Sequence, residues 1–424
     1  MELQQQKLTA IAQAIRQKEG SDQPIPAADF SQRIAGLETG GGAPAGLRTV
    51  QLSVSDPQAG QATGGGQASD GMTVTVAAQA NQGYNFAGWQ ENGQTVSDQE
   101  SYTFAIAADR ALEAQFARSV MGLNWKEATM PASATWYSVA YGDGKFVAVS
   151  TLNNKISKKA AYSTDGITWT LAELPTSTGW RSVAYGNGVF VATAVGATSG
   201  GSKTAAYSKD GINWTATTMP STAYWYHIAY GGGKFVAMNG ASSNKAAYSA
   251  DGINWTEITM PILAPWYNLT YGAGRFVAVS GGWSQTGKVA AYSEDGINWT
   301  QSTLPSETYW NNIAYGAGKF VAVAVGANRA SGNKIAYSTD GINWTAGTLP
   351  VSSVWADLSY GNGQFVLVSG SNGSGVSTNK SMYSTDGVNW VSVTPPVVKS
   401  WTSVAYGGGR FVALSNSTTS LYTL

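Results

Sequence analysis

Short runs of alternating apolar and polar residues fill most of the chain from residue 47 onward. The first clear run is Val50, Leu52 and Val54, and several more follow before residue 118. Alternation with a period of two places every second side chain on the same face of a strand. We therefore predict a small β domain over residues 47–118.

The first 38 residues follow a helical spacing instead. Leu8, Ile11 and Ile15 fall on one face of a helix, and a second short helix is predicted to follow it. Two such helices cannot bury a core by themselves. Residues 1–38 are therefore either a solvated leader or a helical attachment and oligomerisation segment, and the Gly/Ala/Pro-rich residues 39–46 are a flexible linker.

From residue 119 onward the chain repeats one pattern. Each repeat holds two Trp residues 11 positions apart, and successive repeats are 41 to 46 residues long. The first Trp of the pair is Trp125, Trp169, Trp214, Trp255, Trp299, Trp344 or Trp390, and the second is Trp136, Trp180, Trp225, Trp266, Trp310, Trp355 or Trp401. A fixed period of this length indicates a tandem array of one supersecondary unit.

Each repeat predicts four strands joined by tight turns. Gly-x-Gly separates the first strand from the second, and Asp-Gly separates the third from the fourth. Four strands in roughly 44 residues are typical of one β-propeller blade. Residues 119–424 are therefore predicted to form a seven-bladed β-propeller. The strand at Trp125 is expected to complete the last blade and close the ring, because Leu421–Thr423 end where that blade has its third strand.

Composition narrows the function classes. Lys plus Arg and Asp plus Glu number 25 each, so the net charge is zero and nucleic-acid binding is not expected. Without Cys and with His227 as the single His, the chain offers no thiolate nucleophile and no Cys or His cluster for a metal. No apolar run approaches the ~20 residues of a membrane span, and residues 1–20 lack a signal-peptide core. We expect no metal, no cofactor and no membrane insertion.

A Ser-x-Asp-Gly-x-x-Trp hairpin occurs six times. It resembles the Asp box of sialidase-like propellers, in which the family pattern has one more residue between Asp and Trp. The six Asp residues are candidates for calcium binding or catalysis, but a structural role is favoured, in which each Asp caps its own turn and the Trp packs between blades. These residues are Asp165, Asp210, Asp251, Asp295, Asp340 and Asp386.

The repeats differ from one another in the loop after the second strand and in the connection between repeats. In an up-and-down blade these two segments share one face, and we interpret that face as a binding surface, since surface drift would alter both faces. Its aromatic candidates are Tyr137, Tyr224, Tyr226, Tyr267, Trp283 and Tyr309. Its hydrogen-bonding candidates are Arg181, His227, Asn268, Asn311, Asn312 and Asp357. Aromatic rings beside amides and hydroxyls suit sugars and, almost equally, protein partners.

Two positions near this face have an interpretation that involves neither a ligand nor a metal. The second Trp of each repeat does not vary, so it is expected in blade packing rather than ligand contact. His227 stands where most repeats have Ser or Asn, and we interpret it as a polar surface residue rather than a metal ligand.

Two resemblances bear on function. A segment near the start of the chain resembles the N-terminal segment of tail and baseplate-associated proteins in phages of Gram-positive bacteria. Its sequence is LTAIAQAIRQKEGSDQPIPAADFSQRIAGL. The order of Gly83-Tyr84, Phe86 and Gly88-Trp89 resembles the internalin B-type repeat domain of bacterial and phage surface proteins. The second resemblance implies a spacer or adhesion unit, with Trp89 in its core rather than in a ligand platform.

These features favour a non-catalytic receptor-binding protein of a phage tail or tail-like particle, located in the virion. It would recognise a bacterial cell-surface glycan or protein through the variable face, attach to tail or baseplate proteins through residues 1–38, and gain avidity as a homotrimer. The first alternative is a glycoside hydrolase or depolymerase, for which Glu307 and Asp357 are the acids on that face. A bacterial surface adhesin and a purely structural adaptor are the others.

Overall fold

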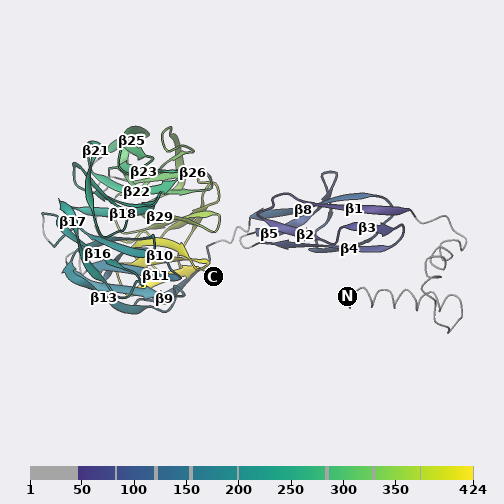
Figure 1. Ribbon diagram of the computed structural model, residues 1–424, viewed down its shortest axis with the longest axis horizontal. Helices are drawn as coiled ribbons and strands as arrows, with labels where there is room; N and C mark the ends of the chain where they lie inside the picture. The colour runs from purple at the N-terminus through teal and green to yellow at the C-terminus, as the bar shows by residue number, and fades with distance from the viewer. Residues whose placement is uncertain are drawn as a thin grey trace, which may run out of the picture. The chain divides into compact units, whose positions relative to one another are not determined.

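The chain divides into two compact units, residues 1–119 and 120–424 (Figure 1). The computed structural model describes residues 46–81, 84–118, 123–151, 156–197, 200–281, 286–326, 330–372 and 374–423. The predicted helices of residues 1–38 lie outside this part of the chain. All regular secondary structure in the described residues is β-strand. No helix among them is long and apolar enough to cross a membrane.

The first unit consists of two sheets that enclose one core. Its strands are β1 (Leu47–Val54), β2 (Gly60–Thr63), β3 (Gly66–Ser69), β4 (Thr73–Ala80), β5 (Tyr84–Glu91), β6 (Gln94–Ser97), β7 (Ser101–Ala105) and β8 (Arg110–Arg118). One sheet has the order β3-β1-β8-β5-β6, with β1 parallel to β8, and the other has the order β2-β4-β7. Trp89 is fully buried in the core, with the Phe86 ring 5.8 Å from its own, so it is a packing residue.

Each repeat of the second unit folds into four antiparallel strands. The first strands are β10 (Thr135–Gly142), β14 (Trp180–Gly186), β18 (Trp225–Gly231), β22 (Trp266–Gly272), the second half of β25 (Thr300–Gly316), β29 (Trp355–Gly361) and β33 (Trp401–Gly407). The second strands are β11 (Lys145–Thr151), β15 (Val189–Ala194), β19 (Lys234–Asn239), β23 (Arg275–Ser280), β26 (Lys319–Val325), β30 (Gln364–Ser369) and β34 (Arg410–Ser415).

The third and fourth strands complete each sheet. The third strands are β12 (Ser157–Ser163), β16 (Ser202–Ser208), β20 (Ser243–Ser249), β24 (Gly287–Ser293), β27 (Gly332–Ser338), β31 (Ser381–Ser384) and β35 (Thr419–Thr423). The fourth are β13 (Thr170–Thr178), β17 (Thr215–Ala223), β21 (Thr256–Ala264), the first half of β25, β28 (Thr345–Ser353), β32 (Val391–Val393) and β9 (Trp125–Thr129), which pairs with β35. Figure 1 shows β10, β18, β22 and β29 toward the middle of this unit and β13, β17 and β21 at its outside.

Apolar packing between neighbouring sheets makes the core of this unit. In β11, Phe146, Val147, Ala148 and Val149 are all fully buried, as a strand covered on both faces requires. The second Trp of each repeat is also buried, with no more than 1% of its surface exposed: Trp136, Trp180, Trp225, Trp266, Trp310, Trp355 and Trp401. These Trp residues are packing residues, as predicted.

A glycine at the end of each first strand lets the next sheet approach closely. A Cβ on Gly142 would lie 2.0 Å from Cγ of Tyr185, which is far inside van der Waals contact, so only glycine fits. The same contact, at 2.0 to 2.1 Å, joins Gly186 to Tyr230, Gly231 to Tyr271, Gly272 to Tyr315, Gly316 to Tyr360, Gly361 to Tyr406 and Gly407 to Tyr141. The pair of Gly407 and Tyr141 joins β33, in the last repeat, to β10, in the first repeat.

Each Asp of the repeated hairpin caps its own turn. Asp165 Oδ1 accepts hydrogen bonds from the amides of Ile167 and Thr168, both at 2.8 Å, and from the hydroxyl of Ser163 at 2.9 Å. Burial disfavours the charged carboxylate, but these hydrogen bonds together outweigh it and hold the pKa of Asp165 below its usual value. The same hydroxyl and amide bonds recur at Asp210, Asp251, Asp295, Asp340 and Asp386.

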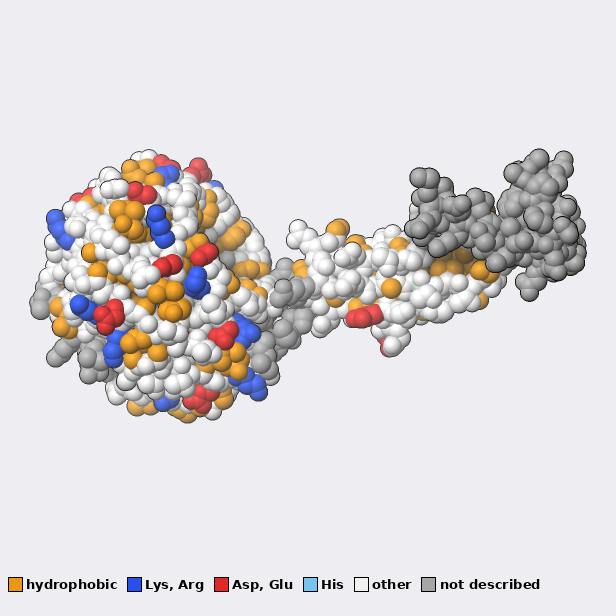
Figure 2. Space-filling model, turned by 60° about the horizontal axis from the view of Figure 1, so that its bottom comes forward, with side chains coloured by type: hydrophobic (Ala, Val, Ile, Leu, Met, Phe, Trp, Pro, Cys, Tyr) orange, Lys and Arg blue, Asp and Glu red, His pale blue; other side chains and the backbone are white. Residues whose placement is uncertain are grey.

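Charged side chains of opposite sign are mixed on the surface. On the face seen in Figure 2, basic and acidic side chains are scattered over the second unit among hydrophobic and uncharged surface. This distribution agrees with the zero net charge and gives that face no extended region of one sign.

Candidate functional site

A cavity of about 210 Å3 opens where the first strands of the repeats begin. Every repeat contributes the two residues that follow its second Trp. The first of these, here called the bulge residues, are Tyr137, Arg181, Tyr226, Tyr267, Asn311, Ala356 and Thr402. The second, here called the ring residues, are Ser138, Ser182, His227, Asn268, Asn312, Asp357 and Ser403. Thr135, Gly370, Ser371, Ser400, Trp401 and Asn416 complete the lining.

A β-bulge in each first strand places these two residues at the cavity. Trp136 pairs with Ser150 and Ser138 pairs with Val149, so Tyr137 is the additional residue inserted between two successive pairs. The same register shift follows the second Trp in the other repeats: Trp180, Trp225, Trp266, Trp310, Trp355 and Trp401. A bulge changes the direction of the side chains that follow it, and here it brings a bulge residue and a ring residue from each repeat to one cavity.

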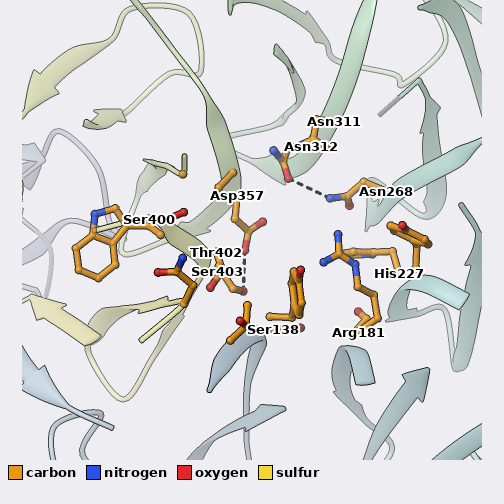
Figure 3. A pocket seen from close by; sticks show the side chains of 18 of the residues that line it. Ser138, Arg181, His227, Asn268, Asn311, Asn312, Asp357, Ser400, Thr402 and Ser403 are labelled. Carbon is orange, nitrogen blue, oxygen red and sulfur yellow. Dashed lines mark hydrogen bonds between the residues drawn. The ribbon is translucent and has the colours of Figure 1, made fainter. Parts of the chain in front are cut away.

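Four ring residues link their own sheet to the next one. The hydroxyl of Ser138 accepts a hydrogen bond from the amide of Val183 at 3.1 Å, and Ser182 accepts one from Ile228 at 3.2 Å. At the other end of the chain, Ser403 accepts from the amide of Val139 at 3.2 Å. Asp357 Oδ2 accepts from the amide of Val404 at 2.8 Å and from the hydroxyl of Ser403 at 2.9 Å (Figure 3).

Three consecutive ring residues, His227, Asn268 and Asn312, depart from that pattern. Asn268 donates from Nδ2 to Asn312 Oδ1 at 3.3 Å, and Asn312 donates to the carbonyl of Trp355 at 3.5 Å. His227 Nδ1 and Asn268 Oδ1 are buried and have no hydrogen-bond partner among the described residues. Two buried polar atoms in the residues that line the cavity therefore lack the partner that such atoms normally have.

Four bulge residues stack on one side of the cavity. The Arg181 guanidinium carbon lies 4.3 Å from the centre of the Tyr137 ring and 4.7 Å from that of Tyr226. The Tyr226 and Tyr267 rings follow, 4.9 Å apart and tilted by 45°. A cation held between two aromatic faces is a favourable cation–π arrangement. The other bulge residues, Asn311, Ala356 and Thr402, are small or polar, so the cavity has one aromatic side and one polar side.

Burial shifts the two titratable ring residues in directions that reduce charge. Burial raises the pKa of Asp357 to about 6, although hydrogen bonds from Val404, Ser403 and Leu358 and the charge of Arg181 oppose that rise. Burial, reinforced by the Arg181 charge, lowers the pKa of His227 to about 4. At pH 7 His227 is therefore neutral, and Asp357 ionises at a higher pH than a carboxyl group in water does.

The cavity brings together most of the candidates found in the sequence. Tyr137, Arg181, Tyr226, His227, Tyr267, Asn268, Asn311, Asn312 and Asp357 all line it. His227 is recessed in the cavity, with a buried Nδ1, and is not the surface residue predicted from its neighbours in the repeat. The ring residues Ser138, Ser182 and Ser403 are not among the candidates, because a serine lacks the aromatic, charged or amide group that singles out the others.

Two described aromatic candidates do not line the cavity, and a third cannot be placed. Tyr224 does not line the cavity, and its amide is bonded to Asn239 Oδ1 at 3.2 Å. Tyr309 packs against a hydrophobic cluster that includes Val325. Trp283 lies outside the described residues.

The acids of the cavity are few. Asp357 is the one carboxylate among the lining residues, and Glu307 accepts a hydrogen bond from Thr286 away from the cavity. Within the described part of the chain, no three His, Asp or Glu side chains are grouped closely enough to hold a metal ion. Paired-carboxylate hydrolysis requires a second acid across the reacting bond, and the lining residues do not supply one.

Comparison with known proteins identifies the folds of both units. Residues 50–120 match the model of the divergent InlB B-repeat domain. No curated protein matches the chain. Among solved structures, virginiamycin B lyase from Staphylococcus aureus matches with a TM-score of 0.59 and 15% identity over 71% of this chain and 99% of that one.

Two further structures match the chain at similar identity. A streptogramin B lyase structure has a TM-score of 0.59 and 14% identity over 73% of this chain and 100% of that one. YCF48 bound to D1 peptide has a TM-score of 0.53 and 16% identity over 71% of this chain and 96% of that one. Similarity at this level shows the fold alone. The chain therefore contains an InlB-type repeat domain and a β-propeller-like array of four-stranded sheets.

Proposed function

We propose that residues 119–424 form a closed ring of seven blades whose central cavity is a binding site. Three contacts support closure between the last repeat and the first. β9 pairs with β35, the hydroxyl of Thr402 donates to the carbonyl of Trp136, and Ser403 accepts from the amide of Val139. The packing of Gly407 against Tyr141 adds a fourth.

We infer that this cavity binds a bacterial cell-surface glycan without cleaving it. The observation that carries this inference is the stack of Tyr137, Arg181, Tyr226 and Tyr267, which lines one cavity together with the polar side chains of His227, Asn268 and Asn312. The C–H faces of a sugar ring pack on aromatic faces, while its hydroxyls bind polar side chains. The cavity is smaller than the ~300–1,000 Å3 of drug-sized sites, so it fits a single or terminal sugar residue.

The arrangement along the chain supports a role in attachment. We propose that residues 1–38 bind phage tail or baseplate proteins, as their resemblance implies, and that residues 47–118 act as a spacer before the binding unit. In this proposal the protein belongs to the virion or to a tail-like particle. A homotrimer would present three cavities and raise avidity for a weakly bound sugar.

The test is binding of the full chain to a glycan array and to whole bacteria. Tyr226→Ala removes the central ring of the stack, and Tyr224→Ala, two residues earlier and away from the cavity, is the matched control. We expect Tyr226→Ala to weaken binding more than tenfold, as loss of a central aromatic contact does, and Tyr224→Ala to bind like the wild type.

Three results would contradict the proposal. Equal affinity of both variants and the wild type would place the ligand elsewhere, and a chain that binds no glycan would favour an adaptor or a protein receptor. Release of soluble sugar from the bound glycan by the wild type would show the hydrolase or depolymerase alternative instead.

A further inference from the structure

We propose that the ligand is an acidic saccharide and that Arg181 binds its acid group. This inference rests on the proposed function, glycan binding by the central cavity. It goes beyond that function because it names the chemical class of the sugar and the residue that selects it.

Arg181 is positioned to bind an anion. Its guanidinium faces are covered by the rings of Tyr137 and Tyr226, so its N–H edges are the part left to bind a ligand. Within the described residues, the Arg181 side chain has its two cation–π contacts but no hydrogen bond and no ion pair. In Figure 3 its guanidinium points into the space between His227, Asn268 and Asp357. The guanidinium fork matches the oxygens of a carboxylate or phosphate in a bidentate geometry.

No acid in the described part of the chain neutralises Arg181 by direct contact. Asp357 is the nearby acid, but its Oδ2 is bonded to Ser403 and Val404 and its Oδ1 to Leu358. These bonds hold the carboxylate in the contact between neighbouring sheets. A recessed cation that lacks a paired anion is costly, and the acid group of a ligand would remove that cost.

The surrounding groups suit a sugar that carries such an acid. His227 and Asn268 come from the two repeats after that of Arg181 and add an imidazole and an amide to the same lining, which suit the hydroxyl groups of a sugar. The tilted pair of Tyr226 and Tyr267 supplies an aromatic surface next to the cation for the sugar ring. A small inorganic anion would leave both of these features unused.

The experiment compares saccharides that differ only in the acid group. The full chain is titrated by calorimetry with trigalacturonic acid and its methyl ester, with sialyllactose and its methyl ester, and with phosphorylated and unphosphorylated oligomannose. The first two pairs test a carboxylate and the third tests a phosphate. We expect the acidic member of at least one pair to bind about tenfold to a hundredfold more tightly, as a charge-assisted hydrogen bond implies.

Three variants assign that preference to Arg181. We expect Arg181→Gln to lose the preference for the acidic member and Arg181→Lys to keep part of it, because lysine retains the charge without the fork. Lys209→Gln, on an exposed turn residue beside Asp210, changes the net charge equally and is expected to bind like the wild type. Thermal unfolding of each variant shows that the fold is retained.

The outcomes separate this inference from the proposed function. Equal binding of acidic and neutral members, or a preference that Arg181→Gln leaves unchanged, overturns the inference while glycan recognition stands. Binding of no saccharide by the wild-type chain refutes the proposed function and this inference with it.

Discussion

Replacing Gly407 by alanine tests whether the second unit is a closed ring. A Cβ at this position would lie 2.0 Å from Cγ of Tyr141, whereas ordinary contact begins at 3.4 Å. The aromatic ring of Tyr141 would have to move by about 1.4 Å, but it is packed against the ring of Phe146, with the two ring centres 4.8 Å apart. Overpacking of this kind costs about 1–3 kcal/mol, and the lower entropy of the unfolded chain with alanine offsets only about 0.4–1 kcal/mol of it.

The assay is thermal and urea unfolding of the full chain, followed by Trp fluorescence. For a unit of more than 250 residues we expect the midpoint of Gly407→Ala to fall by about 2–6 °C. Gly200→Ala is the control, because no atom lies within 4 Å of its added Cβ and its backbone is not in the left-handed region. That variant is expected to unfold at the wild-type midpoint or slightly above it.

A double-mutant cycle makes the prediction specific to closure. Tyr141→Ala removes the ring that the new methyl group would meet, so Gly407→Ala should cost almost nothing in that background. Since the two residues are at opposite ends of the repeat array, favourable coupling between them requires the ends to meet. The same cost for Gly407→Ala with and without the Tyr141 ring would refute the closed ring.

Two further predictions concern a buried imidazole and the core of the first unit. Because burial lowers the pKa of His227 from 6.5 to about 4, the unfolded chain takes up its proton first as the pH falls, and wild-type stability is lost from about pH 6.5 down to pH 4. The free energy of unfolding of His227→Asn, measured in urea, should therefore rise relative to that of the wild type by up to about 3 kcal/mol as the pH falls from 7 to 4. If the difference in unfolding free energy between the two proteins does not change with pH, the assigned pKa is contradicted. Trp89→Ala should destabilise the first unit by about 3–5 kcal/mol and remove hydrogen-exchange protection from residues 47–118. Met72→Ala, at an exposed position, should do neither. Protection that persists in Trp89→Ala would show that the indole ring is dispensable to that core.

Much of the strand order could be predicted from the sequence because the repeats enforce it. The two Trp residues of each repeat, together with the turns at Gly-x-Gly and Asp-Gly, divide that repeat into the four strands that the structure contains. The bonds at Asp165 and its equivalents also follow from local chemistry, since the capping atoms lie within three residues of the Asp. Local signals of this kind do not depend on distant parts of the chain.

The site could be predicted only in part because a β-bulge decides which side chains reach it. Tyr224 and Tyr226 are two residues apart and would share a face of a regular strand, so alternation along the sequence predicts the same surroundings for both side chains. The bulge between Trp225 and His227 breaks this relation and brings Tyr226 but not Tyr224 to the cavity. A bulge depends on pairing with the neighbouring strand, which alternation along one strand does not reveal.

The same cause separates Tyr309 from Asn311. Tyr309 pairs with Val325 before the bulge and packs in a hydrophobic cluster, while Asn311 follows Trp310 and lines the cavity. The stacking of Arg181 between two rings was likewise beyond sequence reasoning, because Tyr137 and Tyr226 come from the repeats on either side.

The most direct test of the central claim is a crystal structure of the full chain with the saccharide that binds it most tightly. We predict electron density for one sugar residue in the central cavity, packed on Tyr226 and Tyr267, with its acid group on Arg181. A sugar bound at the outer strands or on the first unit, with the cavity empty, would contradict the account.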